Sequence, residues 1–111
     1  MKQFHTVVLE RMAFFTTDFS TEPYECGWAS EALFFIRFHD VIGTEVSQES
    51  IVQVSVDGIN WIDEGTYFPI LTDTGDFFVK VKHFGGWLRL KNCINGKESS
   101  IKQTIHLVLK E

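Results

Sequence analysis

The 111-residue chain has few basic residues, prolines and cysteines and no long apolar run, and each of these shortages argues against a class of protein. Ten Lys and Arg face fifteen Asp and Glu, which gives a formal net charge of −5. No basic surface is therefore available to displace the counterions of a phosphate backbone. We expect neither a nucleic-acid partner nor binding to an anionic membrane surface. Two prolines and a charged fraction of 23% argue against a disordered chain.

Long apolar runs and cysteines are also scarce. No run is long enough to span a bilayer, and the first five residues lead directly into an alternating pattern without an apolar leader. We therefore expect no signal peptide and no membrane span. Cys26 and Cys93 alone cannot form a zinc site. Without an export signal we expect free thiols, and a disulfide between the two remains the alternative.

Aromatic residues are abundant, with eleven Phe and three Trp in a chain that is 44% hydrophobic. The clearest strand pattern is residues 51–56, where Val52, Val54 and Val56 share one face. Asp57 and Gly58 tolerate positive φ, so we predict a two-residue type I′ turn there. A return strand then places Trp61 in the core. Asp57, Asn60 and Asp63 also resemble an incomplete calcium loop, but turn chemistry is the simpler interpretation.

The rest of the chain alternates in the same way. About eight strands joined by short turns, with no helix, predict an all-β, single-domain antiparallel β-sandwich, of which the jelly roll is one form. The polar stretch 42–49 and the pair Asn95-Gly96 are expected to connect strands. Residues 1–25 of this single domain (1–111) are either an ordinary first strand or an arm or edge strand used in assembly. Gln103 is a polar exception on the apolar face of the last strand.

Residues 32–41 form the most apolar strand, with aromatic side chains on both faces. Phe34, Ile36 and Phe38 share one face, whereas Phe35 and Arg37 lie on the other. Such a strand is either central in the sheet or meets a partner with its outer face. Residues 77–83 also alternate, and their two lysines predict a solvent face or an edge.

No group of residues predicts catalysis, and we expect no enzyme activity, cofactor or metal. The four histidines stand singly on different strands, without the spacing of a metal site: His5, His39, His83 and His106. Asp63 and Glu64 could serve a hydrolase only if both carboxylates faced one cleft. Surface aromatics remain as candidates, either for stacking on sugar rings or for a protein interface. The candidate contact residues are Trp28, Phe35, Arg37, Tyr67 and Trp87.

One stretch carries a resemblance. Residues 55–61 read S-V-D-G-I-N-W, residues 77–81 form a strand, and residues 86–90 read G-W-L-R-L. This layout resembles small, jelly-roll-like β-sandwich proteins of tailed-phage virions and, more weakly, discoidin-type modules. The matching part is about half of the chain, and its positions are turn and core positions.

The resemblance implies a non-enzymatic structural protein: a capsid decoration, head-completion or fibre-associated component. Its partners would be further copies of itself, or a capsid or tail protein, and it would reside in the virion or the host cytoplasm. The doubly apolar strand 32–41 and the apolar N-terminal segment fit this expectation. The alternative is a carbohydrate-binding module that uses Trp28, Tyr67 or Trp87.

Overall fold

The computed structural model describes residues 4–82 and 84–111. Residues 1–3, where we expected no signal peptide, lie outside the described residues. His83, one of the four histidines considered as metal ligands, lies outside them as well. Every regular element is an antiparallel strand, which confirms the all-β prediction: β1 (Phe4–Phe15), β2 (Phe19–Ser20), β3 (Tyr24–Glu25), β4 (Glu31–Ser55), β5 (Ile62–Tyr67), β6 (Gly75–Lys82) and β7 (Trp87–Lys110). In the described part of the chain, no helix is long and apolar enough to cross a membrane.

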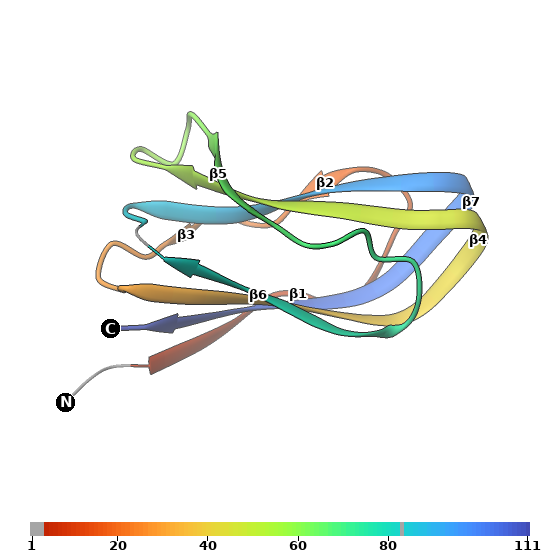
Figure 1. Cartoon of the computed structure of the whole chain (residues 1–111), viewed down its shortest axis with the longest axis horizontal. Coiled ribbons are helices and arrows are strands. Elements are labelled where there is room, and N and C mark those ends of the chain that lie inside the picture. Colours follow the sequence, from red (N-terminus) through yellow and green to blue (C-terminus); the bar gives the residue numbers. More distant parts are fainter. Residues whose placement is uncertain (1–3, 83) are drawn as a thin grey trace.

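The architecture is set by β4 and β7, which pair with each other from Glu31↔Lys110 to Ser55↔Trp87 and bend over midway. Figure 1 shows the resulting two layers, joined where these strands bend. At the bends the backbone of Gly43 and Gly96 has φ of 123° and 124°, a region that favours glycine. The predicted connections at residues 42–49 and at Asn95-Gly96 are therefore wrong. They are corners inside continuous strands, because the positive φ redirects the chain while the pairing resumes beyond it.

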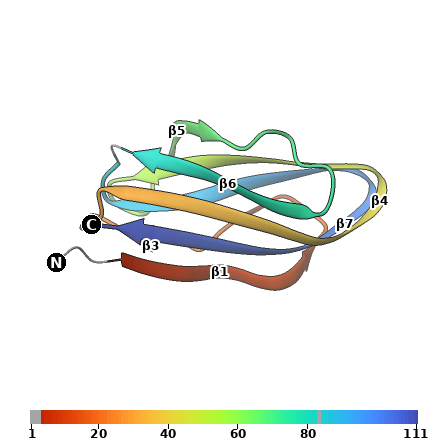
Figure 2. The same ribbon diagram turned by 60° about the horizontal axis from the view of Figure 1, so that its bottom comes forward.

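Each layer contains four strand positions. Layer A consists of β1, residues 100–110 of β7, residues 31–42 of β4, and β6, in that order (Figure 2). Layer B consists of β2 and β3 together, residues 87–95 of β7, residues 47–55 of β4, and β5. In both layers a strand from late in the chain lies between early ones, as in the paired Greek keys of a jelly roll. The β-sandwich prediction is confirmed.

The core lies between the two layers. Phe34, Ile36 and Phe38 point inward from layer A and are at most 2% exposed, as the alternation predicted. Leu88 and Leu90 meet them from layer B and are fully buried. The crossing segment after β5 closes one side, because its Phe68 and Leu71 are buried and its backbone bonds to β4.

Four polar side chains are also buried in this core: Gln48, Ser50, Asn92 and Gln103. Gln48 and Gln103 come from opposite layers and exchange hydrogen bonds, with N···O distances of 3.0 and 2.7 Å. Ser50 donates to Asn92 at 2.6 Å. The polar exception at Gln103 therefore has a partner across the core, and the two glutamines tie the layers together.

Candidate functional site

The outer face of layer A carries the candidate site. On β4, alternation turns Phe35 and Arg37 outward between buried neighbours. The register then places Phe78 of β6 beside Phe35, and His106 of β7 on its other side. Val8 of β1 continues the row beyond His106. The rings of Phe35 and Phe78 stack with their centroids 5.6 Å apart, so one row of side chains crosses all four strands.

Large apolar side chains remain exposed on this face. They come from β1, β4 and β6: Phe4 (67% exposed), Val8 (38%), Phe14 (52%), Phe35 (37%), Ile42 (49%) and Phe78 (55%). The register assigns the β1 residues to the outer side, because Phe4, Val8 and Phe14 pair with the outward-facing Lys110, His106 and Lys102. Exposed apolar side chains that gather on one face of a sheet are a feature of contact sites in soluble proteins.

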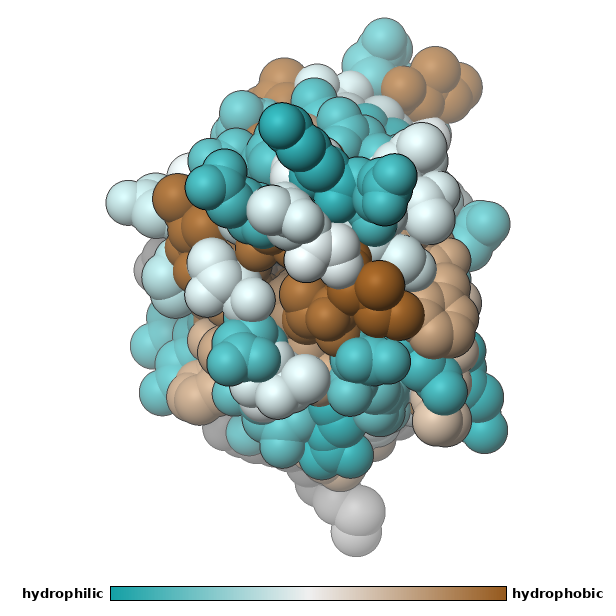
Figure 3. Space-filling view, turned by 90° about the vertical axis from the view of Figure 1, so that its right-hand side faces the viewer, coloured by the Kyte–Doolittle hydropathy of each residue, from teal (hydrophilic) through white to brown (hydrophobic). Residues whose placement is uncertain are grey.

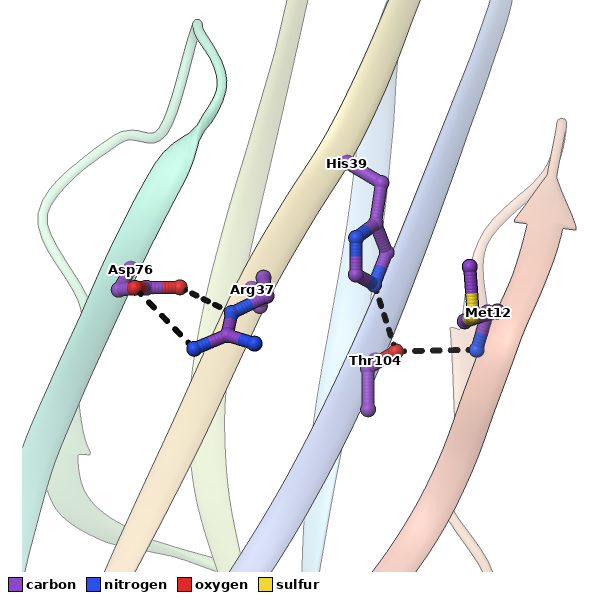
Figure 4. A network of polar contacts seen from close by, with 5 residues as sticks. All are labelled: Met12, Arg37, His39, Asp76 and Thr104. Atoms are coloured by element: carbon purple, nitrogen blue, oxygen red, sulfur yellow. Dashed lines mark hydrogen bonds and ion pairs between the residues drawn. The ribbon is translucent and has the colours of Figure 1, made fainter.

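Polar side chains flank the apolar row. Arg37 donates to Asp76 with an N···O distance of 2.6 Å, and both side chains are more than half exposed (Figure 4). The hydrogen bond from Arg37 lowers the pKa of Asp76, so this carboxylate is ionised over the ordinary pH range. Further along β4, the His39 ring nitrogen Nε2 lies 2.7 Å from the hydroxyl of Thr104 on β7, which also accepts the backbone N–H of Met12 on β1. These contacts link all four strands of layer A.

A shallow hollow of about 290 Å³ lies next to the Phe35 ring. Its lining is mostly apolar, with one ion pair at the rim: Thr6, Phe35, Ile36, Arg37, Asp76, His106 and Val108. The carboxylate at this rim is already paired with Arg37. The hollow can therefore receive an apolar side chain, and its groups do not form a nucleophile–base pair.

The other candidate contact residues lie elsewhere. Trp28 is in the loop between β3 and β4 and is 39% exposed, whereas Tyr67 ends β5 and is 68% exposed. Trp87 is partly buried beside Gly58, where a Cβ would lie 3.2 Å from its ring. Within the described part of the chain, no ring stacking joins these three aromatics. At the bend end, which faces the viewer in Figure 3, a small hydrophobic area interrupts a mainly polar surface.

Residues 55–61 and 86–90, two of the three stretches behind the resemblance, form one end of layer B, whereas residues 77–81 lie in β6 of layer A. The Ser55 hydroxyl accepts the backbone N–H groups of Asp57 and Gly58, and the Asp57 carboxylate accepts those of Ile59 and Asn60. The hydrogen bonds that the Asp57 carboxylate accepts, first that of the Asn60 backbone and then that of Ile59, hold the pKa of Asp57 well below its ordinary value. Gly86 lies so close to the Ser55 carbonyl that a Cβ would overlap the oxygen. Turn chemistry is thus the correct interpretation of Asp57, and its carboxylate is already occupied.

Two predictions about this end are wrong. The connection from β4 to β5 spans residues 56–61 and is not a two-residue turn, because the side chains of Ser55 and Asp57 stabilise a longer loop. Trp61 is only partly buried and lies outside the core. The Arg89 guanidinium lies 4.4 Å above its ring centroid and is held there by Gln53.

The titratable residues weighed for chemistry remain separate. Asp63 accepts a hydrogen bond from Gln53, whereas Glu64 accepts one from the backbone of Thr66. The two carboxylates thus have different local partners and do not face a common cleft. Among the described residues no three His, Cys, Asp or Glu side chains gather as a metal site would need.

Both cysteines are free thiols, as expected. The Cys26 thiol is buried and donates to the Gly86 carbonyl at 3.2 Å. Burial, together with the charge of Glu25, raises the pKa of Cys26 to about 12. This thiol is therefore a structural group that stays protonated at neutral pH.

No protein-family model and no curated protein matches the chain. Among solved structures, the SPBc2 prophage-derived protein YomS is similar, with a TM-score of 0.63 and 9% identity over 100% of this chain and 96% of that chain. The PBSX exported protein XepA is similar at a TM-score of 0.59 and 8% identity over 98% of this chain and 36% of that chain. The VP2 subviral particle of infectious bursal disease virus is similar at 0.58 and 9% identity, over 98% of this chain and 32% of that chain.

These likenesses establish a shared fold. The chain is a jelly-roll β-sandwich of the kind found in prophage-encoded and viral capsid proteins, which confirms the resemblance to phage β-sandwich proteins at the level of the fold. It spans nearly the whole length of YomS but only about a third of the XepA and VP2 chains.

The sequence identified part of the candidate face and missed the rest. Phe35 and Arg37 were singled out, whereas Phe4, Phe14 and Phe78 were not. Phe78 could have been found, because alternation already placed it on the polar side of β6 with two lysines. The position of Phe4 and Phe14 on the same face depends on the pairing of β1 with β7, which no local pattern contains.

Proposed function

We propose that this chain is a non-enzymatic structural component of a virion, in the role of a capsid decoration, head-completion or fibre-associated protein. It acts through protein contacts made by the outer face of layer A. The observation that carries this proposal is the set of exposed phenylalanines on that face, led by the Phe35–Phe78 stack. The fold shared with prophage-encoded and capsid proteins supports the setting.

The physical argument rests on the cost of exposed apolar surface. A Phe side chain that moves from water into a packed interface gains about 1.5–3 kcal/mol. Phe35 and Phe78 contact each other, yet more than a third of each side chain remains exposed. A partner surface that covers both rings would remove this exposed area from water. Such buried aromatic clusters are the usual source of binding energy at protein interfaces.

The experiment compares the wild-type protein with a Phe35→Glu/Phe78→Glu variant in particles produced from the genome that encodes the chain. Immunoblotting of sedimented particles should find the wild-type protein in the particle fraction and the variant in the free fraction. Val56→Glu is the matched control, because Val56 is 91% exposed in the loop at the end of layer B. Wild-type protein that stays out of particles would refute the proposal.

A carbohydrate-binding role is the second candidate, and the surroundings of Tyr67 favour it. This ring lies beside a hollow of about 410 Å³ that is lined by Ile51, Pro69, Ile70 and neighbouring residues. An exposed ring next to a hollow is a suitable platform for a sugar face. Binding to a glycan array that disappears in Tyr67→Ala would support this role, and no binding across the array would remove it.

A further inference from the structure

The outward side chains of layer A have a self-complementary layout along the two central strands. At one end Glu31 of β4 lies opposite Lys110 of β7, and near the other end Asp40 lies opposite Lys102. Between them Leu33 lies opposite Val108. The face therefore has an acidic group on β4 and a basic group on β7 at each end. Between them lie the apolar Leu33, Phe35 and Val108 together with the polar Arg37, Thr104 and His106.

This layout has a consequence for a second copy. A two-fold axis that lies in the face, parallel to the strands and midway between β4 and β7, would place β4 of one copy over β7 of the other. Glu31 would then face the second copy's Lys110, and Asp40 its Lys102. Because the relation is mutual, each opposite-charge contact occurs twice, as in every isologous interface.

The outer strands fit the same operation. The axis exchanges β6 with β1, so Phe78 would face Val8 of the second copy and Lys82 would face Phe4. All of these residues are exposed. No pair of like charges is brought together along the central strands. Sheets that pack face to face keep their strands within about 30° of each other, which this axis allows.

The area is sufficient for a weak but specific pair. Four strands about 4.8 Å apart and about ten residues long, at roughly 3.3 Å per residue, give a footprint of roughly 600 Å² per copy. Two such faces bury roughly 1,200 Å², at the lower end of the range for specific interfaces.

We propose that the outer face of layer A binds the same face of a second copy, related by a two-fold axis between β4 and β7. This inference rests on the proposed function and specifies the partner of the contact face. It concerns the geometry of self-association, so it can fail while the structural role stands.

The test is a charge swap at one end of the face, read by sedimentation velocity from about 1 to 200 µM. In Glu31→Lys the introduced lysine would face Lys110 of the second copy, and in Lys110→Glu the introduced glutamate would face its Glu31. Each variant alone should dimerise at least tenfold more weakly than the wild type, because two attractive contacts become repulsive. An equimolar mixture should recover dimers, since both contacts are again of opposite charge.

Lys91→Glu is the matched control, since Lys91 is exposed on the outer side of layer B, and it should dimerise as the wild type does. A wild-type dimer with no recovery in the mixture would overturn the arrangement and leave the structural role intact. A monomeric wild type that still enters particles would show that the face binds another protein. A monomeric wild type that is also absent from particles would refute the proposed function as well.

Discussion

Replacing the buried glutamines should reveal how strongly they couple the two layers. Among the described residues, Gln103→Leu removes the one donor to the Gln48 side-chain oxygen, although the Gln48 amide N–H still reaches Ser50 and Asn92. Leaving one buried acceptor unpaired costs about 1–3 kcal/mol. Gln48→Leu is more disruptive, because both polar ends of the Gln103 side chain lose their hydrogen bond to Gln48. We expect it to cost about 2–4 kcal/mol.

The double variant Gln48→Leu/Gln103→Leu should lose less stability than the two single variants lose together. Both buried polar groups are removed together, and Ser50 still donates to Asn92 at 2.6 Å. Replacing both partners of a hydrogen bond by apolar groups of similar shape is nearly neutral. The loss of stability in the double variant should therefore be about 2–3 kcal/mol smaller than the sum of the two single losses.

The measurement is urea unfolding followed by tryptophan fluorescence. With a slope of about 1–3 kcal/mol per M, each single variant should lower the midpoint by roughly 1 M, and the double variant by clearly less than the two shifts combined. All three variants should remain folded, because a domain of this size has about 5–15 kcal/mol of stability. Losses in the single variants that simply add would refute the idea that the two glutamines act as a pair.

Three further predictions concern single residues. Gly86→Ala should lower the free energy of unfolding in urea by about 2 kcal/mol or more, because the φ of Gly86 is 80° and the new Cβ would overlap the Ser55 carbonyl. Gly85→Ala should change this free energy little, because a Cβ at Gly85 would lie in open space. The pKa of Asp57 is depressed in the folded protein, so its stabilising effect should be present above about pH 4 and be lost as the pH falls further. In Asp57→Asn the urea midpoint should therefore fall less between about pH 4 and lower pH than it does in the wild type. Thiol labelling of the folded protein at pH 8 should modify Cys93 and leave the buried Cys26 untouched until urea unfolds the chain; equal rates would contradict its burial.

Burial along single strands could be predicted from the sequence. The alternation from Ala32 to Phe38 gave the correct inner face, because a strand side chain can point only to one side or the other. The same reasoning gave the correct inner and outer sides of β6. The fold class followed from strands repeated at short intervals, which is why it could be anticipated without knowing how the strands pair.

The corners and the loop could not be predicted, for a common physical reason. Gly43 and Gly96 have positive φ in the middle of strands, and the residue type that permits a turn equally permits a corner. Only the pairing of β4 with β7 on both sides of the bend tells the two apart. At Asp57-Gly58 the side chain of Ser55 favoured a longer loop, an effect that a two-residue turn pattern does not include.

The candidate face could be predicted only as far as one strand extends. Phe35 and Arg37 lie two residues apart on β4, so the alternation predicts that they point to the same side of the sheet. Phe78 and His106 join them through pairings between residues far apart in the chain. The register between strands determines which side chains share a face, and the sequence of a single strand does not contain this register.

The molecule departs from the usual distribution of polar and apolar groups both inside and outside, and one exception of each kind shows how the two differ. Inside, Gln48 and Gln103 are polar groups in the core, but each satisfies the other, so the fold itself explains them. Outside, Phe35 and Phe78 stack together and still expose apolar area that no other part of the described chain covers. An interior exception that is fully paired stabilises the fold. An exterior one that remains uncovered supports the proposed contact through the outer face of layer A.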